Sequence, residues 1–213
     1  MTVTKKFLRR YMNLPVVIRM LRTGKITFLS PATWDDRNDS YFMELYKRAR
    51  RLRSLLALCF SQETETYHHW RVFADGPSGV CISFNKSDLI HAVERRSGVT
   101  VGPVSYVRLN DLEDEIREVH SLPFLKRAPF EPEREFRFIY ESKRHEYDFL
   151  DVDIPLSCID RIYLSPWMPE TISESVKEVL NQIVTSEQLK ITRSTLIQND
   201  TWAKYGRKIV DEG

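Results

Sequence analysis

Two glutamates one residue apart give the clearest chemical signal in the sequence. Glu133 and Glu135 precede Arg137, and aromatic residues surround them. Alternate side chains of a strand share a face, so these three would lie together, with Arg134 and Phe136 on the opposite face. Neighbouring carboxylates raise one another's pKa, and an adjacent arginine holds one of them ionised. The cluster suits a general base or an anchor for a ribose hydroxyl, whereas a solvated edge strand with ion pairs explains the same residues.

A turn rich in carboxylates lies earlier in the chain. It runs Trp34-Asp35-Asp36-Arg37-Asn38-Asp39. Such side chains commonly accept hydrogen bonds from the amides of their own turn. Alternatively, three carboxylates could hold Mg²⁺. Combined with the basic segment 47–53, that alternative predicts a nucleic-acid-binding or metal-dependent nuclease module.

The segment Tyr67 to Ala74 places two histidines beside aromatic residues. His68 and His69 are adjacent, so they cannot share one face of a helix and are a poor chelating pair. We therefore expect no metal here. Trp70 and Phe73 are three residues apart, which is ordinary core spacing on a helical turn, although an exposed pair would also form a stacking platform.

Composition limits the class of protein. The chain has 213 residues, 42% of them hydrophobic, and a net charge of +2. These values predict one globular domain over residues 1–213, with at most a local basic face for nucleic acid. The three cysteines are widely spaced, which favours free thiols in the cytoplasm. No apolar run is long enough to span a bilayer, and no export signal precedes the domain, so we expect no membrane partner.

Helix and strand signals alternate without a regular rhythm. We expect helices at residues 13–24, 41–53, 87–96, 111–120 and 171–184, the last with a capping box from Thr171 to Glu174. We expect strands at residues 25–29, 55–61, 80–84, 101–106, 136–140, 159–164 and 189–195, and an edge strand within 144–153. This order predicts an α+β fold with a central mixed or split sheet. The sequence lacks a glycine-rich phosphate loop, which argues against Rossmann-type and P-loop enzymes.

Several short motifs occur in a fixed order along most of the chain. They are Gly24 to Pro31, Trp34 to Asp39, Cys59-Phe60-Ser61, Trp70 to Ala74, Gly79 to Phe84, Val104-Ser105-Tyr106, Lys126 with Phe130, Glu133-x-Glu135-Phe136-Arg137, and Ile159 to Pro166. In this order they resemble the bacterial family catalogued as domain of unknown function 2971. The sequence departs from the pattern of that family where Val72 and Phe73 replace a histidine and a tyrosine.

The same motif order is similar to that of ADP-ribosyltransferase-like domains. This resemblance implies a split sheet that clamps NAD in a cleft, in a toxin or phage-defence setting, and a glutamate on a late strand. It assigns Glu135 as the catalytic carboxylate, Glu133 as its partner and Arg137 as the residue that orients it. A carboxylate there would stabilise the positive charge that develops on the ribose as nicotinamide leaves.

The resemblance also implies residues that bind the cofactor. These are Trp70, Arg10, Asp36, Ser61 and Phe73, with Trp70 stacking on the nicotinamide or adenine. The enzymes carry an arginine or histidine on the first strand, which Lys25–Leu29 lacks, so Arg9 or Arg10 would supply it from before the first helix. If the replaced histidine and tyrosine do chemistry in the family, the alternative is a catalytically inactive interaction domain.

Overall fold

The computed structural model describes residues 6–74, 76–115, 118–184 and 189–212. Its α-helices are α1 (Leu14–Thr23), α2 (Arg37–Ala49), α3 (Tyr67–Phe73), α4 (Lys86–Glu94), α5 (Leu112–Glu115), α6 (Glu170–Ile183) and α7 (Asp200–Glu212). Its strands are β1 (Phe7–Asn13), β2 (Lys25–Leu29), β3 (Ser54–Ser61), β4 (Gly79–Asn85), β5 (Val99–Pro103), β6 (Ser105–Val107), β7 (Leu125–Arg127), β8 (Glu135–Ser142), β9 (Phe149–Asp153), β10 (Ile159–Leu164) and β11 (Ile191–Arg193).

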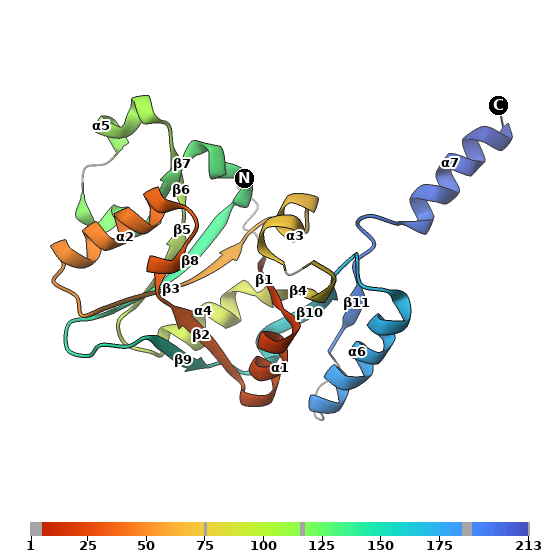
Figure 1. The fold of residues 1–213 in the computed structure, drawn as a ribbon, viewed down its shortest axis with the longest axis horizontal. Coiled ribbons are helices and arrows are strands. Elements are labelled where there is room, and N and C mark those ends of the chain that lie inside the picture. Colours follow the sequence, from red (N-terminus) through yellow and green to blue (C-terminus); the bar gives the residue numbers. More distant parts are fainter. Residues whose placement is uncertain (1–5, 75, 116–117, 185–188, 213) are drawn as a thin grey trace.

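The main sheet is mixed, which confirms the predicted α+β class. Its order is β11-β10-β4-β1-β3-β2-β9, and β8 joins it by pairing with both β3 and β5. The pair β10–β11 is parallel and the other pairs are antiparallel. The short strands β6 and β7 form a separate parallel pair. Figure 1 shows this pair beside α2 and α5, while α7 stands away from the rest of the fold.

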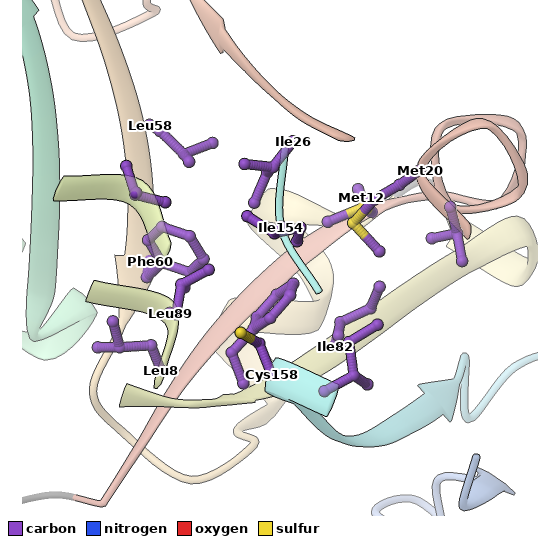
Figure 2. Close-up of a cluster of buried hydrophobic side chains, with 14 of the residues drawn as sticks. Leu8, Met12, Met20, Ile26, Leu58, Phe60, Ile82, Leu89, Ile154 and Cys158 are labelled. Atoms are coloured by element: carbon purple, nitrogen blue, oxygen red, sulfur yellow. The ribbon is translucent and has the colours of Figure 1, made fainter. Parts of the chain in front are cut away.

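Alternation along β3 divides the interior into two cores. Leu56, Leu58 and Phe60 belong to the larger core, which also contains residues of α1, α4 and α6. Figure 2 shows part of this cluster, where Leu58 and Phe60 lie among side chains from several other elements. Leu55 and Ala57 face the other way and pack under α2 with Met43 and Tyr46. The sheet is therefore covered on both faces.

The sheet splits along one edge of β3. At Ala57, β3 pairs with Leu29 of β2, and at Ser61 it pairs with Arg9 of β1. The other edge of β3 pairs with β8 over its whole length, from Ser54–Ser142 to Ser61–Glu135. Strands β1 and β2 therefore diverge from the same edge of β3, and the carbonyl of Cys59 lies between the two points of pairing.

Local signals placed several elements correctly. The Asn13 side chain accepts a hydrogen bond from the Val16 amide at the start of α1, and Gly24 ends the helix with a φ of 63°. Only a residue that tolerates left-handed backbone ends a helix in this way at little cost. Strands 25–29 and 159–164 have the predicted bounds, and the predicted edge strand is β9, at the end of the sheet order.

Other predicted elements were wrong in type or extent. The first strand is β1, which sequence patterns did not reveal. Helix α2 begins at Arg37, because Asp36 caps it, and ends at Ala49. The segment 101–106 is two strands, since β5 ends at Pro103, which has no amide hydrogen to donate. The N-cap of α6 is Pro169, without a side-chain hydrogen bond, so the capping box from Thr171 is absent.

The predicted helix over 111–120 is mostly replaced by shorter structure. Helix α5 covers only Leu112–Glu115, residues 116–117 lie outside the described chain, and Val119–Phe124 is a 3₁₀ helix. The described residues of this segment are almost all exposed, and packing supplies most of the stability of short helices. None of the described helices is long and apolar enough to cross a membrane.

Candidate functional site

A cavity of about 430 Å³ opens where β1 and β3 diverge beneath the start of α2. Its lining residues come from β1, from the turn into α2 and the start of α2, and from the ends of β3 and α3. Others come from β7, from the start of β8 and from the segment between these two strands. They are Arg9, Arg10, Tyr11, Thr33, Trp34, Asp35, Asp36, Asp39, Cys59, Phe60, Ser61, Val72, Phe73, Lys126, Phe130, Glu133 and Glu135. Six of the eight residues predicted for the site line this one cavity.

A buried arginine joins two of the carboxylates below the cavity. Arg137 is fully buried; its Nε donates to Glu135 Oε1 at 2.8 Å and its Nη2 to Glu135 Oε2 at 2.9 Å. The same guanidinium donates to both carboxylate oxygens of Asp39 at the start of α2, and to the Pro123 carbonyl. Arg137 thus does not line the cavity but binds Glu135 from behind, and its orienting role stays a prediction.

A lysine whose side chain is only 9% exposed joins the same carboxylates. Lys126 Nζ lies 2.6 Å from Glu133 Oε2, 3.4 Å from Glu135 Oε2 and 3.8 Å from Asp39 Oδ2. With Arg137, the cluster contains three carboxylates and two cations. The cavity therefore has a floor of fixed charges with one excess negative charge when all groups are ionised.

The two glutamates are in different electrostatic states. Burial acts to raise the pKa of Glu135, but the charge and hydrogen bonds of Arg137, with Lys126, outweigh burial and lower the pKa to about 2. Burial raises the pKa of Glu133, and the neighbouring Lys126 offsets only part of this. Pairs whose pKa values move apart in this way are typical of sites where one carboxylate stays ionised and the other exchanges protons.

The backbone turns between the two glutamates. Glu135 begins β8, one residue before the predicted strand 136–140, but Glu133 ends a 3₁₀ helix, Ala128–Glu133. Arg134 between them is left-handed, with a φ of 44°, and its carbonyl accepts from the Gln62 amide. The two carboxylates thus meet at Lys126 through a turn and not through the simple alternation that the sequence predicted.

A buried histidine holds the backbone of this turn. His69 Nε2 lies 3.2 Å from the Glu133 carbonyl oxygen and 3.0 Å from Ser61 Oγ. Because a carbonyl only accepts, Nε2 carries the proton, and Nδ1 accepts from the Thr66 hydroxyl at 2.6 Å. Burial lowers the pKa of His69, which favours this neutral form. His69 is therefore a donor that positions Glu133, and not a metal ligand.

Ser61 is part of the same network. Its hydroxyl donates to the Glu133 carbonyl at 2.8 Å and accepts from the Glu63 amide at 3.1 Å. Ser61 lines the cavity, as predicted for a cofactor-binding residue, but its hydroxyl hydrogen is already engaged. Its clearest contribution is to the position of the turn that carries Glu133.

Two arginines of β1 also line the cavity. Arg9 Nη1 donates to the Glu63 carbonyl and Arg10 Nη1 to the Cys59 carbonyl, each at 2.7 Å. The Cys59 carbonyl is open to Arg10 because the sheet splits there. Since a guanidinium has five N–H donors, both residues keep donors beyond these bonds. Arg9 and Arg10, which were expected to precede the first helix without belonging to a strand, therefore lie on β1, the first strand of the fold.

Aromatic side chains form the remaining walls. The Trp34 ring lies 4.8 Å from the Arg137 guanidinium, and the Phe130 ring lies 4.7 Å from Lys126 Nζ. Phe73 lines the cavity as predicted and is 41% exposed. Trp70 does not line it: the ring is fully buried, and its Nε1 donates to Glu65. The predicted stacking by Trp70 is thus inconsistent with its position, because core packing covers both faces.

The acidic turn is used by the fold itself. Asp36 Oδ1 accepts from the amides of Asn38 and Asp39, as the simpler interpretation of the turn predicts. Asp36 Oδ2 is buried in the cavity wall and has no hydrogen-bond partner among the described residues. Arg137 donates to both carboxylate oxygens of Asp39, so this side chain is not available as one of the three predicted Mg²⁺ ligands. In the described ranges, no group of three or more His, Cys, Asp or Glu side chains is arranged to hold a metal ion.

Sequence patterns missed or undervalued three residues of the site. Lys126 belongs to the family-like motif, but the motif assigns it no role; its Nζ lies within 4 Å of carboxylate oxygens of Glu133, Glu135 and Asp39. His69 was considered only as a metal ligand. Cys59 was expected to be a buried thiol; it lines the cavity, and burial and the charge of Glu135 raise its pKa well above the ordinary value, which favours the protonated thiol.

Comparisons with known proteins give matches among solved structures only. No protein-family model matches the chain, and no curated protein matches its sequence. The chain is similar to DarT from Thermus sp. 2.9 in complex with ADP-ribosylated single-stranded DNA, with 12% identity, a TM-score of 0.47, and coverage of 89% of this chain and 94% of that chain. The complexes of the same protein with NAD⁺ and carba-NAD⁺ give 10% identity, TM-scores of 0.45 and 0.46, and coverage of 89% and 96%. The resemblance to domain of unknown function 2971 stays a prediction from motifs.

Proposed function

We propose that this protein cleaves NAD at the nicotinamide–ribose bond and transfers the ADP-ribose to an acceptor. The observation that carries the proposal is the position and charge state of Glu135. It lines the cavity, is only 7% exposed, and is held ionised by Arg137 from behind. A carboxylate that is already fixed and ionised can stabilise the positive charge that develops on a ribose in the transition state.

The lining of the cavity suits the two parts of a dinucleotide. Arg9 and Arg10 provide fork-shaped donors that match a diphosphate, and they lie on β1, across β3 from Glu135. Trp34, Phe130 and Phe73 provide apolar surface for flat rings. The volume, about 430 Å³, is within the range of small-molecule sites. The free Asp36 Oδ2 is an acceptor for an amide or hydroxyl of the ligand.

The proposed reaction needs no metal. The bond between ribose C1 and the nicotinamide nitrogen breaks, and its electron pair neutralises the positive nitrogen, so nicotinamide leaves uncharged. The ribose then carries an oxocarbenium-like charge, which the Glu135 carboxylate stabilises. An acceptor hydroxyl, amine or water attacks C1 and loses a proton. Glu133, whose pKa burial raises, is the base that we assign to that proton.

The wider setting belongs to the same proposal. The family resemblance implies a toxin or phage-defence system, and we propose that the chain acts there as a single cytoplasmic domain. None of the three cysteines forms a disulfide in the described chain, and Cys81 and Cys158 are buried, which is compatible with a reducing compartment.

Nicotinamide release from NAD tests the proposal directly. Wild type should release nicotinamide, and Glu135→Gln, which keeps the shape and one acceptor oxygen, should release it roughly 100- to 1,000-fold more slowly. NAD affinity should change much less, because it depends on the arginines and aromatic walls. Folding should be checked by circular dichroism. Equal release by the two proteins removes Glu135 from the mechanism, and a folded wild type that neither binds nor cleaves NAD favours the inactive interaction domain.

A further inference from the structure

Two loops meet at the end of the sheet opposite the cavity. The first, residues 50–53, joins α2 to β3, and the second, residues 143–148, joins β8 to β9. They are adjacent because Ser54 pairs with Ser142 and the Arg53 amide donates to the Ser142 carbonyl at 2.7 Å. Figure 1 shows both loops at the left edge of the fold. Seven residue steps along β3, about 23 Å, separate this end from Ser61 in the cavity.

This end carries an excess of positive charge. Segments 44–53 and 141–148 contain seven lysines and arginines against four carboxylates, an excess of three, whereas the whole chain has a net charge of only +2. Arg48 is paired with Glu44 and Arg50 lies 3.9 Å from Glu141. Within the described chain, four exposed cations of the two loops make no ion pair. They are Arg51, Arg53, Lys143 and Arg144.

Two buried serines hold the second loop in one shape. Ser142 Oγ accepts from the amides of Arg144 and His145, at 3.3 and 3.0 Å. Ser54 Oγ donates to the His145 carbonyl at 3.0 Å and accepts from the Tyr147 amide at 2.7 Å. The exposed basic side chains are thus mounted on a fixed backbone. Such preorganisation lowers the entropic cost of binding a partner.

The first loop contains a residue whose conformation has a cost. Arg51 has a φ of 52°, in the left-handed region that glycine and asparagine adopt more easily. Strained backbone of this kind collects at binding surfaces. An arginine at this position keeps a cation beside Arg53, at the point where the two loops meet.

An aromatic pair adjoins the cations. The rings of His145 and Tyr147 lie 5.9 Å apart, and His145 is exposed. Arginines match phosphate geometry better than lysines do, and exposed rings stack on unpaired bases. We propose that the two loops bind the backbone and bases of a single-stranded nucleic acid, at a surface separate from the cavity.

Binding of labelled homopolymers tests this surface without NAD. Fluorescence anisotropy with fluorescein-labelled oligo(dT) and oligo(U) should show binding by wild type that weakens steeply between about 50 and 200 mM salt. The variant Lys143→Gln/Arg144→Gln should bind about tenfold more weakly at the lower salt. Each lost phosphate contact removes about 0.7 from the slope of log affinity against log salt, so the slope should fall by about 1.4.

Matched variants separate a local surface from general charge. Arg22→Gln/Lys190→Gln removes the same two charges at exposed positions outside the loops and should leave affinity and slope unchanged. His145→Ala should weaken binding about fivefold at every salt concentration, with the slope kept. Nicotinamide release should be the same in all of these variants, because the cavity lies about 23 Å away.

Several results would overturn the proposal. They are no binding by folded wild type at micromolar protein, binding that is insensitive to salt, or equal weakening by the control pair. Binding to vesicles of anionic phospholipid that is as tight as binding to the oligonucleotides would assign the surface to membranes instead. Because the assay contains no NAD, each result is independent of the fate of the proposed cleavage activity.

Discussion

Arg137 and Glu135 are joined by two hydrogen bonds, Nε to Oε1 at 2.8 Å and Nη2 to Oε2 at 2.9 Å. They are alternate residues of β8, so their side chains lie on the same face of the sheet. The guanidinium is fully buried and also binds both oxygens of Asp39. The carboxylate of Glu135 can therefore neither rotate freely nor take up a proton easily, and several consequences can be measured.

The first consequence is sensitivity of the fold to acid. The folded pKa of Glu135 is about 2, below its ordinary value of 4.5, so its ionisation stabilises the fold at neutral pH by about 3 kcal/mol. This contribution is complete above pH 5 and is lost as the pH falls from about 5 to 2. Urea denaturation of wild type and Glu135→Gln across this range measures it. The difference in unfolding free energy between the two proteins should shrink as the pH falls; a constant difference would contradict the assignment.

The second consequence is a large cost for removing the arginine. Arg137→Met keeps much of the volume but leaves Glu135 and Asp39 without their shared buried cation, which should destabilise the fold by about 3–5 kcal/mol. Arg19→Met is the matched control, since Arg19 pairs with Asp151 at 2.5 Å and is 47% exposed. It should cost less than about 1 kcal/mol. If the two variants lose similar amounts of unfolding free energy, burial of the ion pair does not determine the cost of removing its arginine.

The sequence was most informative where local rules determine structure. The Glu135 and Arg137 side chains share a face because strands alternate, and Phe136 and Phe138 accordingly lie in the main core. Helix α1 followed from its cap residues, Asn13 and Gly24. Such features need only neighbouring residues, which is why they could be predicted without knowing the fold.

The rest of the site depends on contacts between distant segments. Strand β1 carries Arg9 and Arg10, but its alternation of exposed and buried residues is weak because one edge meets the split in the sheet. Lys126 lies near Asp39 as well as Glu133, and Asp39 comes from the distant helix α2. Trp70 is buried in the core. The left-handed Arg134 also has no sequence signal, since arginine rarely adopts that backbone.

The third prediction concerns His69 as the donor to the Glu133 carbonyl. His69→Leu leaves this buried carbonyl without one donor and should cost about 1–3 kcal/mol, whereas His69→Gln, whose amide can donate from a similar position, should cost less. Burial lowers the folded pKa of His69, so the unfolded chain binds the proton more readily. Wild type should therefore lose stability as the pH falls below about 6.5, above the range in which Glu135 titrates.

Chemical denaturation between pH 8 and 5 (about the range in which histidine titrates) measures that loss. The dependence on pH in this window should be weaker in His69→Gln, which has no group to titrate there. His91→Gln is a suitable control, because His91 is exposed on α4 and its ring lies 3.5 Å from the Arg95 guanidinium. If His91→Gln removes the pH dependence as fully as His69→Gln, the loss does not arise from the buried ring.

The last prediction separates the two tryptophans that the sequence placed near the site. Trp34 lines the cavity and lies against Arg137, while Trp70 is buried in the core and bonded to Glu65. Trp34→Ala should raise the Kd for NAD roughly tenfold, because stacking of a base on an aromatic ring contributes about 1–3 kcal/mol. Trp70→Ala should instead lower the stability by about 3–5 kcal/mol through the space that it leaves. Calorimetric NAD titration and urea denaturation of both variants provide the comparison, with Trp70→Phe as a milder core change if Trp70→Ala does not fold. Weaker NAD binding in Trp70→Phe than in Trp34→Ala would restore the stacking role to Trp70 and require the α3 segment to move when NAD binds.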